Sequence, residues 1–213
     1  MGIGCWQDVS PSGNTVDVDT TSIIVNVAAG ICLLVFWFGY ALVLPFDRLR
    51  DGVWHLAVNR WWIPINLLGL AGAVLASCGL ILISWTQDLT TLSLVSVLLA
   101  VAGLQLLGGN LAWESVVWPV LARQNHGLLA FDGPLYRSAA LLGYFALAGV
   151  LFAVGYSMLG VAIGDDYPMV VRVGLGLGAV LFAVGSLTGR YQVVARSVGI
   201  CILTASQAAL PIL

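Results

Sequence analysis

Long apolar segments separated by short charged gaps run through almost the whole chain. About 20 apolar residues are enough for a helix to cross the hydrocarbon core of a bilayer. Because unpaired backbone groups are costly in lipid, segments of this kind fold as helices. The pattern predicts an all-α, polytopic membrane helix bundle of about six transmembrane helices, at residues 22–44, 61–84, 91–119, 137–163, 169–188 and 194–213.

Composition excludes the main alternatives to a membrane protein. Of the 213 residues, 60% are hydrophobic and only 8% are charged, too few to cover a soluble domain of this size. Eight basic against ten acidic residues give a net charge of −2, so nucleic acid is not an expected partner. Lysine is absent, which excludes Schiff-base chemistry with retinal or pyridoxal phosphate. The expected partner is the lipid bilayer, and no cofactor is expected.

Arginine is distributed unevenly among the gaps between the apolar segments. Seven of the eight arginines fall in the first, third and fifth gaps or at their edges, and the exception is Arg172. The positive-inside rule then places those three gaps in the cytoplasm and both termini outside. We therefore predict a multi-pass protein of the plasma (cytoplasmic) membrane, with a polar extracytoplasmic tail at 1–21 and a single six-helix transmembrane domain at 22–213.

The first gap, residues 45–60, has a helical spacing of its own. The apolar residues that would share one face of a helix are Leu49, Val53, Leu56 and Ala57. Three nearby tryptophans favour the headgroup layer of a membrane: Trp54, Trp61 and Trp62. We expect a short interfacial helix in this first cytoplasmic loop, which either anchors the second span or serves as a gate or docking helix.

Small residues recur at spacings that let membrane helices approach closely. They occur in the second predicted span (Gly69, Gly72, Ala76 and Gly79) and in the fifth (Gly174 with Gly178, and Gly185 with Gly189). Two uses are open for them: packing within the bundle, or contacts in a homo-oligomer or with other membrane subunits. The hexapeptide VLFAVG occurs at 150–155 and again at 180–185, in two successive predicted spans. We interpret it as a short local repetition rather than as a sign of a duplicated unit.

Glu114 is the only glutamate in the chain, and it lies inside the third predicted span. On a helix, Asn110, Glu114 and Trp118 follow one another at four-residue steps and share a face. Pro119 predicts a kink or a helix end immediately afterwards. The carboxylate lies roughly 13 Å along the helix axis from Arg123. This distance places it in the cytoplasmic leaflet, near the interface but sheltered from free water.

A carboxylate in hydrocarbon must face the bundle, carry a proton or pair with a cation, because its insertion costs about 3 kcal/mol or more. The candidate charge partners are Arg60, Arg123 and Arg137. The candidate ligand or ion site comprises Glu114, Asn110, Asn66 and Trp118, of which Asn66 lies at a similar depth in the second span. The other possibility is a structural ion pair that fastens the third span to a neighbour.

Other polar residues in the predicted spans are expected to hydrogen bond between helices rather than to bind a ligand. They are Asn26, Asn66, Ser77, Gln105, Thr204, Ser206 and Gln207. On its helix Gln105 points away from Glu114, so we expect it to meet a different neighbour.

The residue inventory disfavours an enzyme, and no catalytic residues are assigned. Both histidines, His55 and His126, fall in predicted loops, so no imidazole is available for a haem or metal site between the spans. We favour a small transport or channel-type helix bundle with a Glu114-centred polar site, because an ionisable residue within a span is a functional-site candidate. The alternative is a non-catalytic membrane subunit or scaffold of a larger membrane complex.

Overall fold

The computed structural model is all-helical over the residues it describes, which are 18–44, 52–86, 90–165, 167–185 and 191–212. The elements in chain order are α1 (Val18–Val43), α2 (Trp54–Ala57), α3 (Trp62–Thr86), α4 (Thr91–Gln124), the 3₁₀ turn η2 (His126–Leu129), α5 (Ala139–Ala162), α6 (Met169–Gly185) and α7 (Gln192–Ala209). The predicted all-α fold is confirmed for these residues. The first helix begins at Val18 rather than at residue 22, and the rest of the predicted tail lies outside the described residues.

Four of the helices are long and apolar enough to cross a membrane, judged by length and composition. They are α1, α3, α4 and α5, and α6 is a shorter apolar helix of 17 residues. These helices support a protein embedded in a membrane. The count of six spans, their orientation and the identity of the membrane stay predictions.

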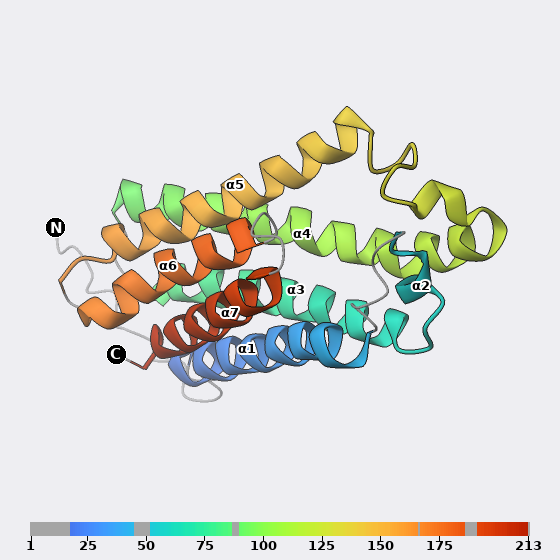
Figure 1. Ribbon diagram of the computed structural model, residues 1–213. Coiled ribbons are helices and arrows are strands. Elements are labelled where there is room, and N and C mark those ends of the chain that lie inside the picture. Colours follow the sequence, from blue (N-terminus) through green and yellow to red (C-terminus); the bar gives the residue numbers. More distant parts are fainter. Residues whose placement is uncertain (1–17, 45–51, 87–89, 166, 186–190, 213) are drawn as a thin grey trace, which may run out of the picture.

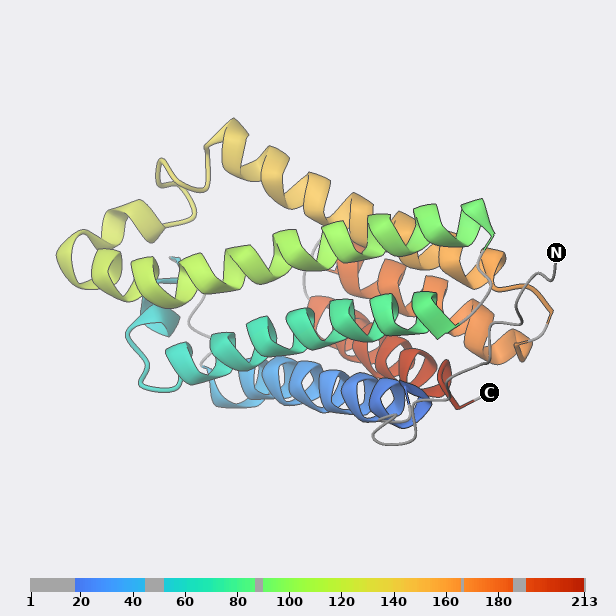
Figure 2. The same cartoon turned by 180° about the vertical axis from the view of Figure 1, so that it is seen from behind.

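The six long helices form a closed ring in which each packs on its neighbours in chain order, and α7 returns to pack on α1. They run back and forth along one direction, and the start of α1 lies at the same end of the bundle as the end of α7 (Figure 1). Seen from behind, α1, α3 and α4 lie side by side (Figure 2). The ring encloses a core to which every long helix contributes.

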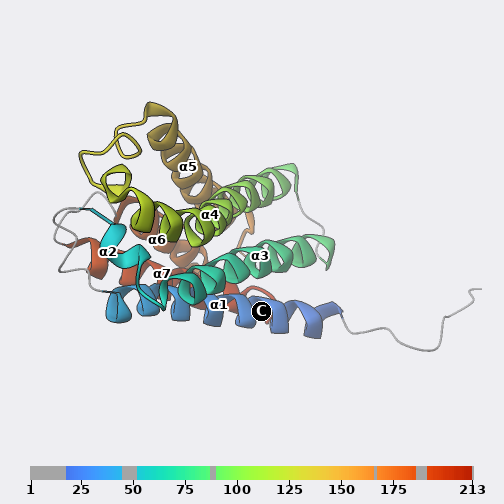
Figure 3. The same ribbon diagram turned by 90° about the vertical axis from the view of Figure 1, so that its right-hand side faces the viewer.

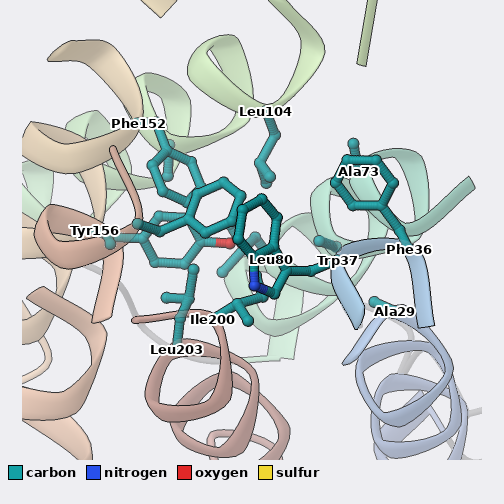
Figure 4. Packing of buried hydrophobic residues seen from close by; sticks show 14 of the residues in the cluster. Ala29, Phe36, Trp37, Ala73, Leu80, Leu104, Phe152, Tyr156, Ile200 and Leu203 are labelled. Carbon is teal, nitrogen blue, oxygen red and sulfur yellow. The ribbon is translucent and has the colours of Figure 1, made fainter. Parts of the chain in front are cut away.

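Aromatic and aliphatic side chains fill this core. Trp37 of α1, Leu80 of α3, Phe152 of α5 and Leu203 of α7 are almost fully buried and meet in the centre of the bundle (Figure 4). The outer faces are also apolar, and Leu42 exposes 81% of its surface. An apolar interior together with an apolar exterior suits a bundle whose surroundings are lipid tails.

The predicted small-residue faces are used for packing within the bundle. A Cβ at Gly178 of α6 would lie 2.6 Å from the backbone nitrogen of Leu203, and one at Gly72 of α3 would lie 2.8 Å from Cγ of Leu33. Both glycines therefore allow close helix contacts. Gly189 lies outside the described residues, and contacts in a homo-oligomer stay a prediction.

Helix α4 continues past Pro119 to Gln124, so a helix end at the proline is wrong. Proline leaves one carbonyl of the preceding turn without its usual donor, and membrane helices tolerate this where neighbouring groups supply hydrogen bonds. The carbonyl that Pro119 leaves without a donor is that of Ser115, four residues earlier. The indole N–H of Trp62 on α3 donates to the adjacent backbone carbonyl, that of Glu114, at 3.0 Å. This bond joins α3 to the turn of α4 that precedes the proline.

The first and third predicted cytoplasmic loops are joined to each other. Gly52 and Ala130 form an isolated antiparallel β-bridge, and the Val53 N–H donates to the Leu129 carbonyl at 3.1 Å. Helix α2 follows, buries Leu56 and packs beside the end of α4 (Figure 3). A short helix is present in the predicted loop, but its apolar residues are covered by protein. Its place at a membrane interface stays a prediction, and residues 45–51 lie outside the described residues.

Gly52 determines how closely the two loops approach. Its φ of +151° favours glycine, and a Cβ there would lie 2.5 Å from the Leu129 carbonyl oxygen. We expect Gly52→Ala to separate the loops and to accelerate tryptic cleavage at the exposed Arg123 and Arg137 several-fold, measured by timed digestion and mass spectrometry. Gly127→Ala is the matched control, because its nearest neighbour would be 3.5 Å away. Equal cleavage rates in the two variants would contradict the joined loops.

Candidate functional site around Glu114

Glu114 lies in the C-terminal half of α4 and is only 8% exposed. Asn110, one turn earlier, donates from Nδ2 to Oε1 of Glu114 at 2.7 Å. The shared face predicted from the four-residue spacing therefore brings these two side chains into a hydrogen bond. The amide stabilises the carboxylate by a charge-assisted bond within a single helix.

Two buried tryptophans cover the next turn of α4. Trp118 stacks on Trp62 of α3, with ring centroids 5.5 Å apart and planes 15° apart. Trp62 is 0% exposed and is covered by protein, and its predicted depth at the headgroup layer stays a prediction. The indole nitrogen of Trp118 is buried and has no hydrogen-bond partner among the described residues. The stacked pair adjoins Glu114, because Trp118 lies one turn after it on α4 and Trp62 donates to its backbone carbonyl.

Asn66 lies one turn beyond Trp62 on α3 and is fully buried. Its Nδ2 donates to the Trp62 carbonyl at 2.8 Å, and its Oδ1 has no partner within the described ranges. No hydrogen bond of the described residues joins Asn66 to Glu114. The two residues are connected through Trp62, and a cavity shared between them stays a prediction.

None of the three predicted charge partners forms an ion pair with Glu114 in the part of the chain that the structure describes. Arg60 lies over a neighbouring tryptophan ring at 5.4 Å, and Arg123 and Arg137 are exposed. Among the described residues, Arg196 of α7 is the cation that interacts electrostatically with Glu114. The site therefore draws its positive charge from the last helix.

Arg196 is held by aromatic rings from two other helices. Its guanidinium carbon lies 4.5 Å from the ring centroid of Trp37 on α1 and 4.6 Å from that of Phe182 on α6. Its Nε is buried without a hydrogen-bond partner among the described residues. Tyr40 of α1 interacts electrostatically with both Arg196 and Glu114. The interior thus holds an acidic and a basic side chain that interact electrostatically and form no direct ion pair among the described residues.

Sequence reasoning missed Arg196 because it counted this arginine as a marker of a cytoplasmic gap. The position lies within the predicted last span, 194–213, which was the available signal. An arginine in a span is as much a functional-site candidate as a glutamate.

A groove of about 280 Å³ lies beside this centre, between α4 and α5. It is lined by Gly109, Asn110, Trp113, Leu141 and Tyr144. Asn110 belongs both to the groove and to the hydrogen bond with Glu114. The carboxylate is therefore one hydrogen bond away from a surface that a ligand can reach from the side of the bundle.

The groove exists because α4 and α5 diverge, as the rise of α5 away from α4 toward its N-terminus shows (Figure 1). The two backbones meet at Gly155, where a Cβ would lie 2.6 Å from Cα of Ala100, and at Gly103, which lies equally close to the backbone of Phe152. Near the start of α5, a Cβ at Gly143 would have nothing within 4 Å. Glycine contacts at one end and open space at the other produce a V-shaped helix pair.

A second buried polar cluster joins four helices. The Gln207 side chain of α7 donates from Nε2 to Asn26 Oδ1 of α1 at 3.0 Å and to the Ala76 carbonyl of α3 at 3.2 Å. Its Oε1 accepts from the Tyr156 hydroxyl of α5 at 2.6 Å. The predicted interhelical roles of Asn26 and Gln207 are confirmed. Tyr156 was missed, because a tyrosine within an apolar run resembles an ordinary core aromatic.

Two further polar predictions have opposite outcomes. Gln105 donates from Nε2 to Ser77 Oγ of α3 at 2.8 Å, which confirms that it meets a neighbour other than Glu114. Thr204 donates to the Ile200 carbonyl of its own helix at 2.7 Å, so an interhelical hydrogen bond is wrong for its hydroxyl. A threonine in a helix bonds locally because a carbonyl one turn back is always within reach.

No family model, curated protein or solved structure matches the chain. Within the described ranges, no group of three or more histidine, cysteine, aspartate or glutamate side chains is placed to hold a metal ion. A functional assignment therefore depends on the geometry around Glu114.

Proposed function

We propose that the protein is a small membrane transport or channel-type helix bundle in which Glu114 forms the central polar site. The observation that carries the proposal is a buried carboxylate with an amide partner but no direct ion pair among the described residues. A buried carboxylate with a purely structural role is expected to form an ion pair with a cationic side chain, because a buried charge without an ion pair is costly. A carboxylate without an ion-pair partner is able to bind and release a proton, an ion or a charged ligand.

The surroundings of Glu114 support exchange with the membrane side of the bundle. Asn110 connects the carboxylate to the groove between α4 and α5. Arg196 of α7 supplies a second charge in the interior of the bundle. With Glu114 ionised, its charge and that of Arg196 cancel in the empty site, and a bound proton or cation adds one positive charge.

The second candidate function is a non-catalytic membrane subunit or scaffold. The backbone contacts at Gly103 and Gly155 and the apolar outer faces favour it, since both are features of helices built for packing. Association with a second copy or with other membrane subunits belongs to this candidate and is also compatible with transport.

The test is flux through vesicles that contain the purified protein. Currents are recorded on a solid-supported membrane after concentration jumps of protons, sodium, potassium and benzyltrimethylammonium. We expect Glu114→Gln to reduce the wild-type current at least about tenfold, which corresponds to about 1.4 kcal/mol. Asp132→Asn makes the same chemical change at an exposed loop carboxylate and should leave the current unchanged.

Two results would contradict transport. One is a wild-type current no larger than that of empty vesicles for all four ions. The other is an undiminished current in Glu114→Gln, with size-exclusion profiles equal to wild type. Loss of a copurifying subunit on this substitution would favour the scaffold.

A further inference from the structure

The groove between α4 and α5 opens sideways from the bundle and has a mixed lining. Trp113 and Tyr144 present aromatic surfaces, Leu141 is aliphatic, and Asn110 is the polar member. The Tyr144 hydroxyl donates to the Leu106 carbonyl of α4, so its proton is already used and its ring is held across the groove. A volume of about 280 Å³ is at the lower end for ligand pockets. The groove therefore fits a small body with an apolar part.

The charge of the groove is set by Glu114. None of its five lining residues carries a positive charge, and Asn110 directs its Nδ2 to the carboxylate. With Nδ2 committed, the amide oxygen is the acceptor that Asn110 has left to offer. An acceptor backed by a carboxylate and flanked by two aromatic rings is complementary to a cation.

Arg196 does not line the groove, so its positive charge does not occupy the position of a bound cation there. Its guanidinium lies over Trp37 and Phe182, neither of which lines the groove. It forms no direct ion pair with Glu114 among the described residues. The carboxylate therefore has room for a second cation on the side of α5.

We propose that the groove binds a small organic monocation with an apolar body. The ammonium group lies against Asn110 and the rings of Trp113 and Tyr144, within the field of Glu114, and the apolar body follows Leu141 toward the lipid. Aromatic faces and a carboxylate together recognise alkylated ammonium ions, which gain cation–π attraction and lose little hydration. The inference rests on the proposed function, since it names the substrate class of the Glu114 site.

The experiment is equilibrium dialysis of radiolabelled benzyltrimethylammonium against the purified full-length protein in lipid nanodiscs. We expect saturable binding that neopentylbenzene, the neutral carbon analogue of the same shape, does not displace. Glu114→Gln should weaken binding about tenfold, and Glu114→Asp should retain most of it. Trp113→Leu should weaken binding about two- to fivefold, in line with one exposed cation–π contact.

Trp85→Leu is the matched control for Trp113→Leu, because Trp85 is 79% exposed on α3 and lies outside the groove. Each variant is compared with wild type by thermal melting, so that a folding defect is separated from a binding defect. Unchanged binding in a well-folded Glu114→Gln variant would overturn the proposal. So would equal displacement by neopentylbenzene, which would identify the groove as a site for lipid tails.

The inference and the proposed function fail in different ways. Binding that depends on Glu114 without current in any ion condition would retain the cation site and remove transport. Proton, sodium or potassium currents that depend on Glu114, without binding of benzyltrimethylammonium, would retain transport and remove the organic cation.

Discussion

Gly155→Ala is expected to lower the free energy of unfolding by about 3 kcal/mol, because overpacking at a backbone contact costs this order of energy. The added Cβ would lie 2.6 Å from Cα of Ala100, and the atoms it meets are backbone atoms that no rotamer change can move. The two helices must separate, which also removes the dispersion contacts around Phe152. For a chain of this size the melting temperature should fall by roughly 6–12 °C, measured by intrinsic tryptophan fluorescence in detergent.

Gly143→Ala provides the control on the same helix. A Cβ there would meet nothing within 4 Å, so alanine should only raise helix propensity. Its melting temperature should equal or slightly exceed that of wild type. A similar loss in both variants would show that α5 responds to glycine replacement in general, and the close contact with α4 would lose its support.

Gln207→Leu is expected to cost about 2–4 kcal/mol, because two buried groups then lose partners at about 1–2 kcal/mol each. The stranded groups are the Tyr156 hydroxyl and the Asn26 side-chain oxygen. The same fluorescence melts in detergent measure the loss. Thr204→Val is the control on α7, and it should change the melting temperature little, because the threonine bonds only within its own helix.

The pair Gln207→Leu and Tyr156→Phe tests the hydrogen bond directly. If the hydroxyl and the amide oxygen are partners, the double variant loses less stability than the sum of the single losses. Strict additivity would contradict the cluster that joins α1, α3, α5 and α7.

The helices were predictable from the sequence because hydrophobic length alone demands them. The predicted third span begins at residue 91, as α4 does, and in the structure Thr90 caps the helix by accepting from the Ser93 N–H at 3.2 Å. The bond between Asn110 and Glu114 followed from four-residue spacing, which is local geometry. Predictions of this kind need no knowledge of which helix lies beside which.

The remaining features depend on contacts between distant segments. The bridge from Gly52 to Ala130 joins two loops whose sequences carry no pairing pattern. The contact of Gly155 with Ala100 needs a facing helix to be known, because neither residue belongs to a small-residue repeat that points there. Arg196 was assigned by its charge to the membrane surface, whereas cation–π contacts with Trp37 and Phe182 allow it to lie inside.

The close backbone contact between Gly155 of α5 and Ala100 of α4 is a point about which α5 can tilt relative to α4. Leu141 is about 21 Å from Gly155 along the α5 axis, at a rise of about 1.5 Å per residue. A tilt of only about 5° about that point would move the groove end of α5 by roughly 2 Å over this lever arm. The width of the groove beside Asn110 therefore depends on a very small rotation of α5. The Tyr144 hydroxyl, which donates to the Leu106 carbonyl of α4, is the contact at that end that such a rotation would have to break.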